Sequence, residues 1–312
     1  MKAAICTKYG APEVIRIEEI EKPAPSENEI LIKIIAATVH IGDTKVRRLE
    51  PGMGPVTDFF YRFMMRLIVG FNAPRKKILG MELAGLVERT GSNVTRFKIG
   101  DKVFASTEFN FGAHTEYICM KENGIVAHIP NYMSLEEAAP VSNAGLTVLY
   151  NLRKGNIKQG DKVLIYGASG SLGTYAVQMA KYFGAVVTGV CSTGNTEMVK
   201  SIGADYVIDY TKEDFTFSGI KYDFIFDTVG KIPASKRKAA LTADGKFLSA
   251  LSLSSAIKLK LEDLLALKEI CEAAKIKTVI DRVYPLEEII EAHRYVDKGH
   301  KKGNVVITVG KS

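Results

Sequence analysis

The sequence has no run of about 18 apolar residues, the length at which a membrane-spanning helix is expected. Its first ten residues, MKAAICTKYG, lack the longer apolar core of a signal peptide and are typical of a strand. The four cysteines, Cys6, Cys119, Cys191 and Cys271, are far apart and include no C-x-x-C pair, which argues against a disulfide framework or a metal knuckle. We therefore expect a cytoplasmic protein with reduced thiols and no membrane partner.

Acidic residues are outnumbered, with 35 Asp and Glu against 42 Lys and Arg, for a net charge of +7. Such an excess attracts nucleic acid, an anionic membrane or a phosphorylated cofactor. The densest basic cluster, residues 75–77, is short and has no interleaved aromatic residues, so a solvated loop is favoured over an RNA-binding patch. With 312 residues, 46% of them hydrophobic, the chain is long enough for two globular domains, each with its own core.

The pattern of hydrophobic residues changes along the chain. Up to about residue 120, strand-like runs such as residues 29–39 and 81–91 are separated by Gly, Asn and Pro turns. Ser134 and Glu137 then form a capping box, and from there short apolar strands alternate with amphipathic helices. This alternation is typical of a parallel sheet covered by helices on both faces.

The C-terminal segment adds a strand, a helix beginning at Pro285 and a final strand after Gly303, which we predict to return to the first domain. We therefore predict an α/β protein with a β-rich domain over residues 1–118, completed by residues 277–312. A doubly wound parallel-sheet domain is expected over residues 119–276.

One segment of the first domain is typical of a helix. Residues 58–71, DFFYRFMMRLIVGF, place Phe63, Met64 and Leu67 on a broad apolar face, with Arg62 and Arg66 on the other. The simplest interpretation is a helix that packs on its own domain. The alternatives are a lid over an apolar substrate pocket or a contact with a membrane surface.

A glycine-rich turn predicts a phosphate-binding site. Gly167, Gly170 and Gly173 follow a strand and begin a helix, which is the context of the dinucleotide-binding fingerprint. Small residues let the backbone approach a pyrophosphate, and the helix N-terminus offers unpaired N–H groups. We predict contacts to the pyrophosphate from Ala168, Ser169, Gly170, Ser171, Leu172 and Gly173; the alternative is that the glycines are structural.

No acid stands at the end of the second strand of this domain, where an NAD-specific site would present a carboxylate to the ribose hydroxyls. Cys191 occupies that position and is followed by Ser192, Thr193 and Asn195. These polar groups can hydrogen-bond a 2′-phosphate, so we predict NADPH as the cofactor. Because no Arg or Lys lies between Cys191 and Glu197, a polar turn with poor selectivity is the alternative.

Motifs along essentially the whole chain, among them ILGMELAGLVERTGSNVTRFKIGDKVF, GAHTEYI, AGLT and SIGADYVIDY, resemble the medium-chain dehydrogenase/reductase superfamily. The resemblance is greatest to its zinc-independent quinone oxidoreductase branch. It implies a GroES-like catalytic domain interrupted by a Rossmann domain, with the active site between them. It also implies a homodimer, although the segment near residues 255–260 is shorter than in relatives, which leaves the oligomeric state open.

The resemblance further implies where the cofactor binds. The adenosine phosphate is expected near Ser192, Asn195 and Tyr210, with Asn195 standing where many relatives have Lys or Arg. The remaining cofactor residues implied are Thr147, Val229, Gly230, Ala250, Leu251 and Asn304.

Zinc ligands are missing from the positions that match those of the zinc alcohol dehydrogenases. These positions hold His40, Met81 and Asn143, and thioether and carboxamide groups are poor zinc ligands. We therefore expect no zinc and NADPH-dependent reduction of a quinone or an α,β-unsaturated carbonyl, whose charge delocalises as hydride arrives. The expected substrate is small and apolar.

His40, which replaces the Asn usual in this branch, is the leading hydrogen-bond donor to the substrate oxygen. Tyr61 and then Tyr9 follow as candidates, and a purely structural His40 is the alternative. Asp43 is expected to cap the following helix or to hold His40. Two rival functions stay open, a zinc-dependent alcohol dehydrogenase and a non-catalytic, crystallin-like protein that binds NADPH or RNA.

Overall fold

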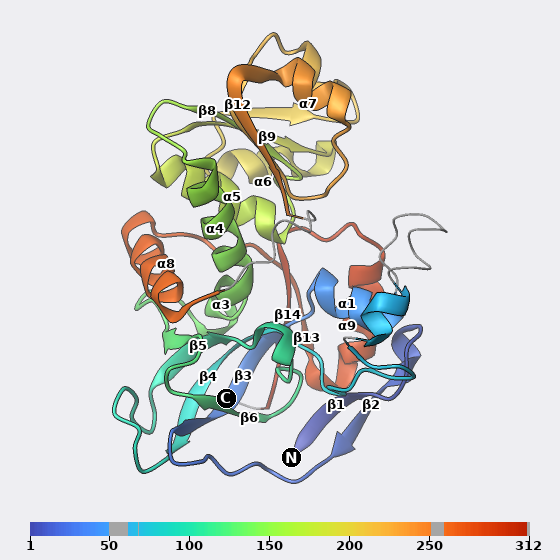
Figure 1. The fold of residues 1–312 in the computed structure, drawn as a ribbon, viewed down its shortest axis with the longest axis vertical. Coiled ribbons are helices and arrows are strands. Elements are labelled where there is room, and N and C mark those ends of the chain that lie inside the picture. Colours follow the sequence, from blue (N-terminus) through green and yellow to red (C-terminus); the bar gives the residue numbers. More distant parts are fainter. Residues whose placement is uncertain (50–61, 68, 251–258, 311–312) are drawn as a thin grey trace. The chain divides into compact units, whose positions relative to one another are not determined.

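The computed structural model describes residues 1–312 except 50–61, 68, 251–258 and 311–312 (Figure 1). The chain divides into two compact units. Unit 1 comprises Met1–Ile129, Met133–Asn143 and Ile280–Ser312, and unit 2 comprises Pro130–Tyr132 and Ala144–Val279. The predicted α/β class is confirmed, because each unit is built on its own sheet and unit 2 has a parallel one. Within the described residues, no helix is both long and apolar enough to cross a bilayer.

Unit 1 is built around a seven-stranded sheet in the order β13-β14-β3-β4-β5-β7, with β6 also paired to β3. Strand β3 is paired along both edges, and eight of its ten residues are buried. The strands are β3 (Glu29–Thr38), β4 (Glu82–Thr90), β5 (Lys102–Ser106), β6 (Tyr117–Lys121), β7 (Val126–His128), β13 (Ile280–Pro285) and β14 (Asn304–Thr308). Strands β1 (Lys2–Cys6) and β2 (Ile15–Glu19) form a separate antiparallel pair, and the helices include α1 (Ile41–Arg48), α3 (Leu135–Ala138) and α9 (Ile289–Asp297).

The C-terminal strand β14 returns to this sheet and pairs with β3, with Val306 opposite Thr38. The division between the units falls later than the predicted boundary at residue 118. Strands β6 and β7 pair with β3 and β5, so this stretch belongs to unit 1 through its sheet hydrogen bonds.

Unit 2 holds a five-stranded parallel sheet in the order β10-β9-β8-β11-β12. Its strands are β8 (Lys162–Tyr166), β9 (Val186–Cys191), β10 (Tyr206–Asp209), β11 (Tyr222–Asp227) and β12 (Leu241–Ser249). The helices are α4 (Leu146–Gly155), α5 (Ser171–Tyr182), α6 (Thr196–Ser201), α7 (Ala234–Ala240) and α8 (Leu261–Ala274). The direction of strand order reverses between β8 and β11, and ligands of such sheets bind at the carboxyl ends of the strands beside this reversal.

The predicted helix over residues 58–71 is described only in part, and residues 62–67 are helical. The prediction that Phe63, Met64 and Leu67 pack against the domain is wrong for residues 62–67, because these side chains are 52%, 53% and 45% exposed. Met65 and Val69 pack against the core of unit 1 instead.

Two glycines of the β8–α5 turn differ sharply in the space around them. A Cβ atom on Gly173 would lie 2.1 Å from the carbonyl oxygen of Gly167, whereas one on Gly170 would meet that oxygen at 3.5 Å, an ordinary contact. Gly170 also has φ −83°, which suits alanine.

We predict that Gly173→Ala destabilises the protein by about 1–3 kcal/mol, because the added methyl group forces the turn away from α5. Gly170→Ala is the matched control and should change the free energy of unfolding by less than about 0.5 kcal/mol. Urea denaturation of the three proteins measures both values. Equal stability of the two variants would contradict the close packing of α5 on the turn.

Candidate active site and cofactor site

The glycine turn lies at the carboxyl ends of the central strands of unit 2. The backbone N–H groups of Gly167 and Ala168 both donate to the carbonyl of Val190, each at 3.0 Å. Gly167 has φ +82°, and a Cβ atom there would lie 2.4 Å from Cγ2 of Val229, which follows β11. The turn therefore sits at the reversal of strand order, together with the predicted cofactor residues of the β11 end.

Asp227, at the end of β11, organises these residues and was missed by the sequence analysis. Its buried carboxylate accepts the backbone N–H groups of Val229, Gly230 and Ile232 at 3.0, 2.7 and 2.8 Å. Its backbone carbonyl accepts from Ala250 at 3.0 Å. The sequence does contain a signal for this role, because an acid at the end of a strand is followed there by a Thr-Val-Gly turn. Of the predicted residues here, Leu251 lies outside the described residues.

Three predicted residues form a connected polar cluster beyond the turn. The Nδ2 group of Asn195 donates to Oγ of Ser169 at 3.2 Å and to Oγ of Ser192 at 3.0 Å. Because each serine oxygen accepts this bond, each hydroxyl proton is available to donate to an anion. The Oδ1 atom of Asn195 is buried and has no hydrogen-bond partner among the described residues.

Thr193 lies next to this cluster but has a different partner. Its hydroxyl donates to Oδ2 of Asp209 at 2.5 Å. Hydrogen bonds from Thr193 and Thr211, with the Lys212 ammonium 3.6 Å away, lower the pKa of Asp209 to about 2. The end of β9 lacks an acid, as the sequence indicates, yet Asp209 of β10 brings a carboxylate that is ionised at neutral pH into a hydrogen bond with Thr193.

The other predicted cofactor residues are spread over both units. Thr147 lies in the first turn of α4, and its carbonyl accepts from Asn151 at 2.8 Å. Tyr210 is 56% exposed and lines a hollow of about 280 Å³ with Lys212, Lys231 and Lys236. Asn304 is buried in β14 of unit 1.

His40, in unit 1, is the N-cap of α1. Its Nδ1 accepts the backbone N–H of Gly42 at 3.0 Å, and its own backbone N–H donates to Oδ2 of Asp43 at 2.8 Å. Burial lowers the pKa of His40 to about 4, with Lys301 and Lys45 acting in the same direction against Asp43. The imidazole is therefore neutral at pH 7, and with Nδ1 accepting, its proton resides on Nε2. Asp43 serves as expected in capping the helix and holding His40.

Lys301 was also missed by the sequence analysis, because the acids that act on it, Glu82 and Asp281, come from distant parts of the chain. Its Nζ donates to the carbonyl of Gly303 at 2.6 Å. Burial lowers the pKa of Lys301 to about 8, with Glu82 and Asp281 opposing that shift. The amine keeps a positive charge near His40 and so favours the neutral imidazole.

The positions expected of a zinc site do not suit the ion. Met81 is buried, with its sulfur 3.5 Å from where a Cβ on Gly42 would lie. Glu82 is also buried and accepts from the hydroxyl of Thr38 at 3.0 Å. No group of three or more His, Cys, Asp or Glu side chains placed to hold a metal occurs within the part of the chain that the structure describes. With one imidazole, a thioether and the amide of Asn143, the donor set does not fit zinc.

The two tyrosines proposed as weaker donors have different outcomes. Tyr61 lies outside the described residues. The hydroxyl of Tyr9 donates to the carbonyl of Gly70 at 2.7 Å, and burial is the main cause that raises its pKa. The hydroxyl proton of Tyr9 is therefore engaged by the backbone, and the role of His40 as a donor stays a prediction.

Comparison with known proteins places these sites in context. The family model described as an alcohol dehydrogenase GroES-like domain matches residues 26–131, and the one described as a zinc-binding dehydrogenase matches residues 202–307. The zinc-binding dehydrogenase match covers none of His40, Met81 and Asn143.

Individual proteins match over almost the whole chain. A 2-methylene-furan-3-one reductase of Solanum lycopersicum is 32% identical over 98% of this chain and 79% of its own length. A chloroplastic quinone-oxidoreductase homolog of Spinacia oleracea is 32% identical over 96% of this chain and 95% of its own. The solved quinone oxidoreductase of Coxiella burnetii is 29% identical, with a TM-score of 0.83 and 99% of both chains covered.

We predict that His40→Ala lowers the free energy of unfolding by about 1 kcal/mol at pH 7, because the N–H of Gly42 loses its cap. His40→Asn should stay close to the parent, since an asparagine oxygen also caps well. The pKa of His40 is lowered from 6.5 to about 4, so the unfolded chain binds more protons in this window. The advantage of the parent over His40→Ala should therefore shrink as the pH falls from 6.5 to 4.

Chemical denaturation at several pH values measures this difference. A constant difference between parent and His40→Ala across that range would show that the imidazole is not held neutral by the fold.

Proposed function

Because the chain belongs to the quinone oxidoreductase branch of the medium-chain dehydrogenase/reductase superfamily, we propose that this NAD(P)H-dependent oxidoreductase uses NADPH to reduce a quinone or an α,β-unsaturated carbonyl. One observation carries the proposal. His40 offers a neutral Nε2–H donor at a position where the zinc-dependent relatives hold a metal ligand. A hydrogen-bond donor suits an acceptor whose negative charge delocalises, and such acceptors are quinones and conjugated carbonyls.

The residues of unit 2 suit a phosphorylated dinucleotide. The glycine at position 170, where even an added Cβ would make only an ordinary contact, and the N-terminus of α5, which has no side-chain cap from Gly170, suit the pyrophosphate. The hydroxyls of Ser169 and Ser192, held by Asn195, are the proposed donors to the 2′-phosphate. The hollow that Tyr210 lines holds three lysines, Lys212, Lys231 and Lys236, against two acids, Glu213 and Asp214, so its excess of positive charge is small.

When bound, the reduced cofactor supplies the hydride. In our proposal, the Nε2–H of His40 then hydrogen-bonds the substrate oxygen, where negative charge develops. Asp43 fixes the start of α1, and the bond from Gly42 to Nδ1 keeps the proton on Nε2, so the donor is oriented before substrate binds. Water supplies the final proton.

The exposed side chains of the helix over residues 62–67 suit an apolar substrate. Phe63, Met64 and Leu67 offer apolar surface that the core of unit 1 does not use. The names of the relatives agree with such a substrate, since one is called a reductase of a methylene-furanone and another a quinone-oxidoreductase homolog.

We predict NADPH-dependent turnover with at least one member of a panel of quinones, enals and enones. The loss of nicotinamide absorbance measures this turnover. His40→Ala should lower kcat/KM by about 10²–10³, the usual effect of removing one oxyanion donor. His40→Asn is the matched control, because its amide can cap the helix and donate a proton, and it should stay within about tenfold of the parent. Because the pKa of His40 is about 4, its titration should leave kcat/KM unchanged between about pH 5.5 and 8.

NADPH binding without turnover of any panel member would overturn the proposal. One zinc per chain in metal analysis would do so too, since our interpretation of Met81 and Asn143 would then be wrong.

We predict that Asp209→Asn tightens NADPH binding relative to NADH. The change removes the negative charge that is hydrogen-bonded to Thr193, the residue after Ser192 of the proposed phosphate site, while keeping a similar side-chain shape. Asn195→Lys should favour NADPH by about tenfold or more, because a hydrogen bond to a charged partner is worth about 1.5–3 kcal/mol. Calorimetric titration of each protein with NADPH and NADH gives the ratio of the two dissociation constants.

Lys200→Ala, on the exposed face of α6, is the charge control and should leave that ratio unchanged. Tighter binding of NADH than NADPH by the parent protein would favour the alternative of an unselective polar turn.

A further inference from the structure

Strand β12 forms one edge of the sheet in unit 2. Among the residues that the structure describes, it pairs with β11 alone. The backbone N–H of Ala250 donates to Asp227 of β11 at 3.0 Å. Since alternate residues of a parallel strand direct their backbone groups to opposite sides, the N–H and C=O of Phe247 point away from β11. Such an edge can accept another strand.

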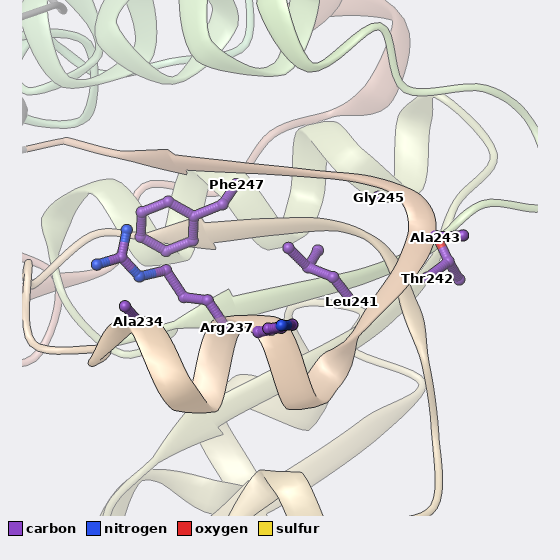
Figure 2. A pocket seen from close by; sticks show the side chains of 8 residues that line it. Ala234, Arg237, Leu241, Thr242, Ala243, Gly245 and Phe247 are labelled. Atoms are coloured by element: carbon purple, nitrogen blue, oxygen red, sulfur yellow. The ribbon is translucent and has the colours of Figure 1, made fainter.

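A groove of about 570 Å³ lies between α7 and this edge (Figure 2). Figure 2 shows the side chain of Arg237 reaching from α7 toward the ring of Phe247. The guanidinium carbon lies 4.3 Å from the ring centroid, and the Nε atom is buried with no hydrogen-bond partner among the described residues. Leu241 adds apolar surface to the same groove, and Lys238 and Thr242 add polar groups.

Charge limits what the groove can hold. Helix α7 and strand β12 carry Lys236, Arg237, Lys238 and Lys246 against one acid, Asp244. Lys236 is paired with Asp214 at 2.5 Å, and none of the residues lining the groove is acidic. A second copy of this chain would bring the same positive charges to the same edge, whereas an acidic partner would complement them.

We propose that this groove binds an extended acidic segment of a partner protein, which adds to β12 as a further strand. Its backbone would pair with that of Phe247, and one of its carboxylates would bind Arg237, whose planar head suits a carboxylate. Its apolar side chains would rest on Leu241 and Phe247. In this proposal β12 does not form the homodimer interface that the family resemblance implies.

The test uses the full chain and a fluorescein-labelled peptide of alternating glutamate and valine. Fluorescence anisotropy of the peptide measures its binding. The peptide should bind, and added salt should weaken the binding. Arg237→Ala/Lys238→Ala should weaken it by about tenfold or more. Lys76→Ala/Lys77→Ala removes the same charge from an exposed segment of unit 1 and is the matched control.

Two further measurements separate the parts of the proposal. A peptide N-methylated at alternate residues keeps its charge but cannot pair with a strand edge, so it should bind more weakly. NADPH binding should be equal in the parent and in Arg237→Ala/Lys238→Ala, which shows that the variant is folded. Because this measurement is separate, failure of the proposed cofactor role and failure of the groove are distinguishable.

Three outcomes would overturn the proposal. The first is equal binding of the acidic peptide and a lysine–valine peptide. The second is equal binding by the two double variants. The third is a dimer in sedimentation that Phe247→Pro, which removes the outward N–H, converts to monomer, because the edge would then serve a second copy.

Discussion

The carboxylate of Asp43 is the constraint on which the candidate active site depends. It is fully buried and accepts the backbone N–H of His40 at 2.8 Å and that of Gly80 at 3.0 Å. One side chain therefore ties the start of α1 to the segment that leads into Met81 and Glu82. A buried carboxylate is tolerated only where hydrogen bonds replace its hydration, so these two N–H groups and this acid stabilise one another. The orientation of His40 follows from that arrangement.

Unit 2 contains a similar arrangement, because the carboxylate of Asp227 accepts three backbone N–H groups after β11. In both units a short-range capping pattern positions groups that come from different strands. Asp209 gives a contrasting case, because its hydrogen bonds hold Thr193 and Thr211 and engage both of its oxygens. Its charge is thereby fixed at the rim of the candidate cofactor site, where it opposes the attraction of Lys212 for an anion.

Local patterns account for the features that the sequence predicts well. The strand, glycine turn and helix over residues 162–182 are adjacent in the chain, the capping box at Ser134 spans four residues, and Asp43 lies three residues from the His40 that it holds. The bond between Thr193 and Asp209 could not be predicted, because strand order sets it, and the acids that face Lys301 depend on the return of the C-terminal segment. The exposed face of residues 62–67 was also unpredictable, since periodicity identifies an apolar face without saying which neighbours cover it.

Strand β3 carries β6 and β14 on the same edge, β6 along its first half and β14 along its second. Strand β14 comes from the far side of unit 2 in the sequence, so a ribosome must synthesise every residue of unit 2 before this edge can be filled. The Rossmann-type unit is thus complete at a time when the other sheet still has an open edge. A chain stalled before Asn304 would hold one finished unit and one with unpaired β3 backbone groups, which a chaperone or protease can distinguish from the full-length protein.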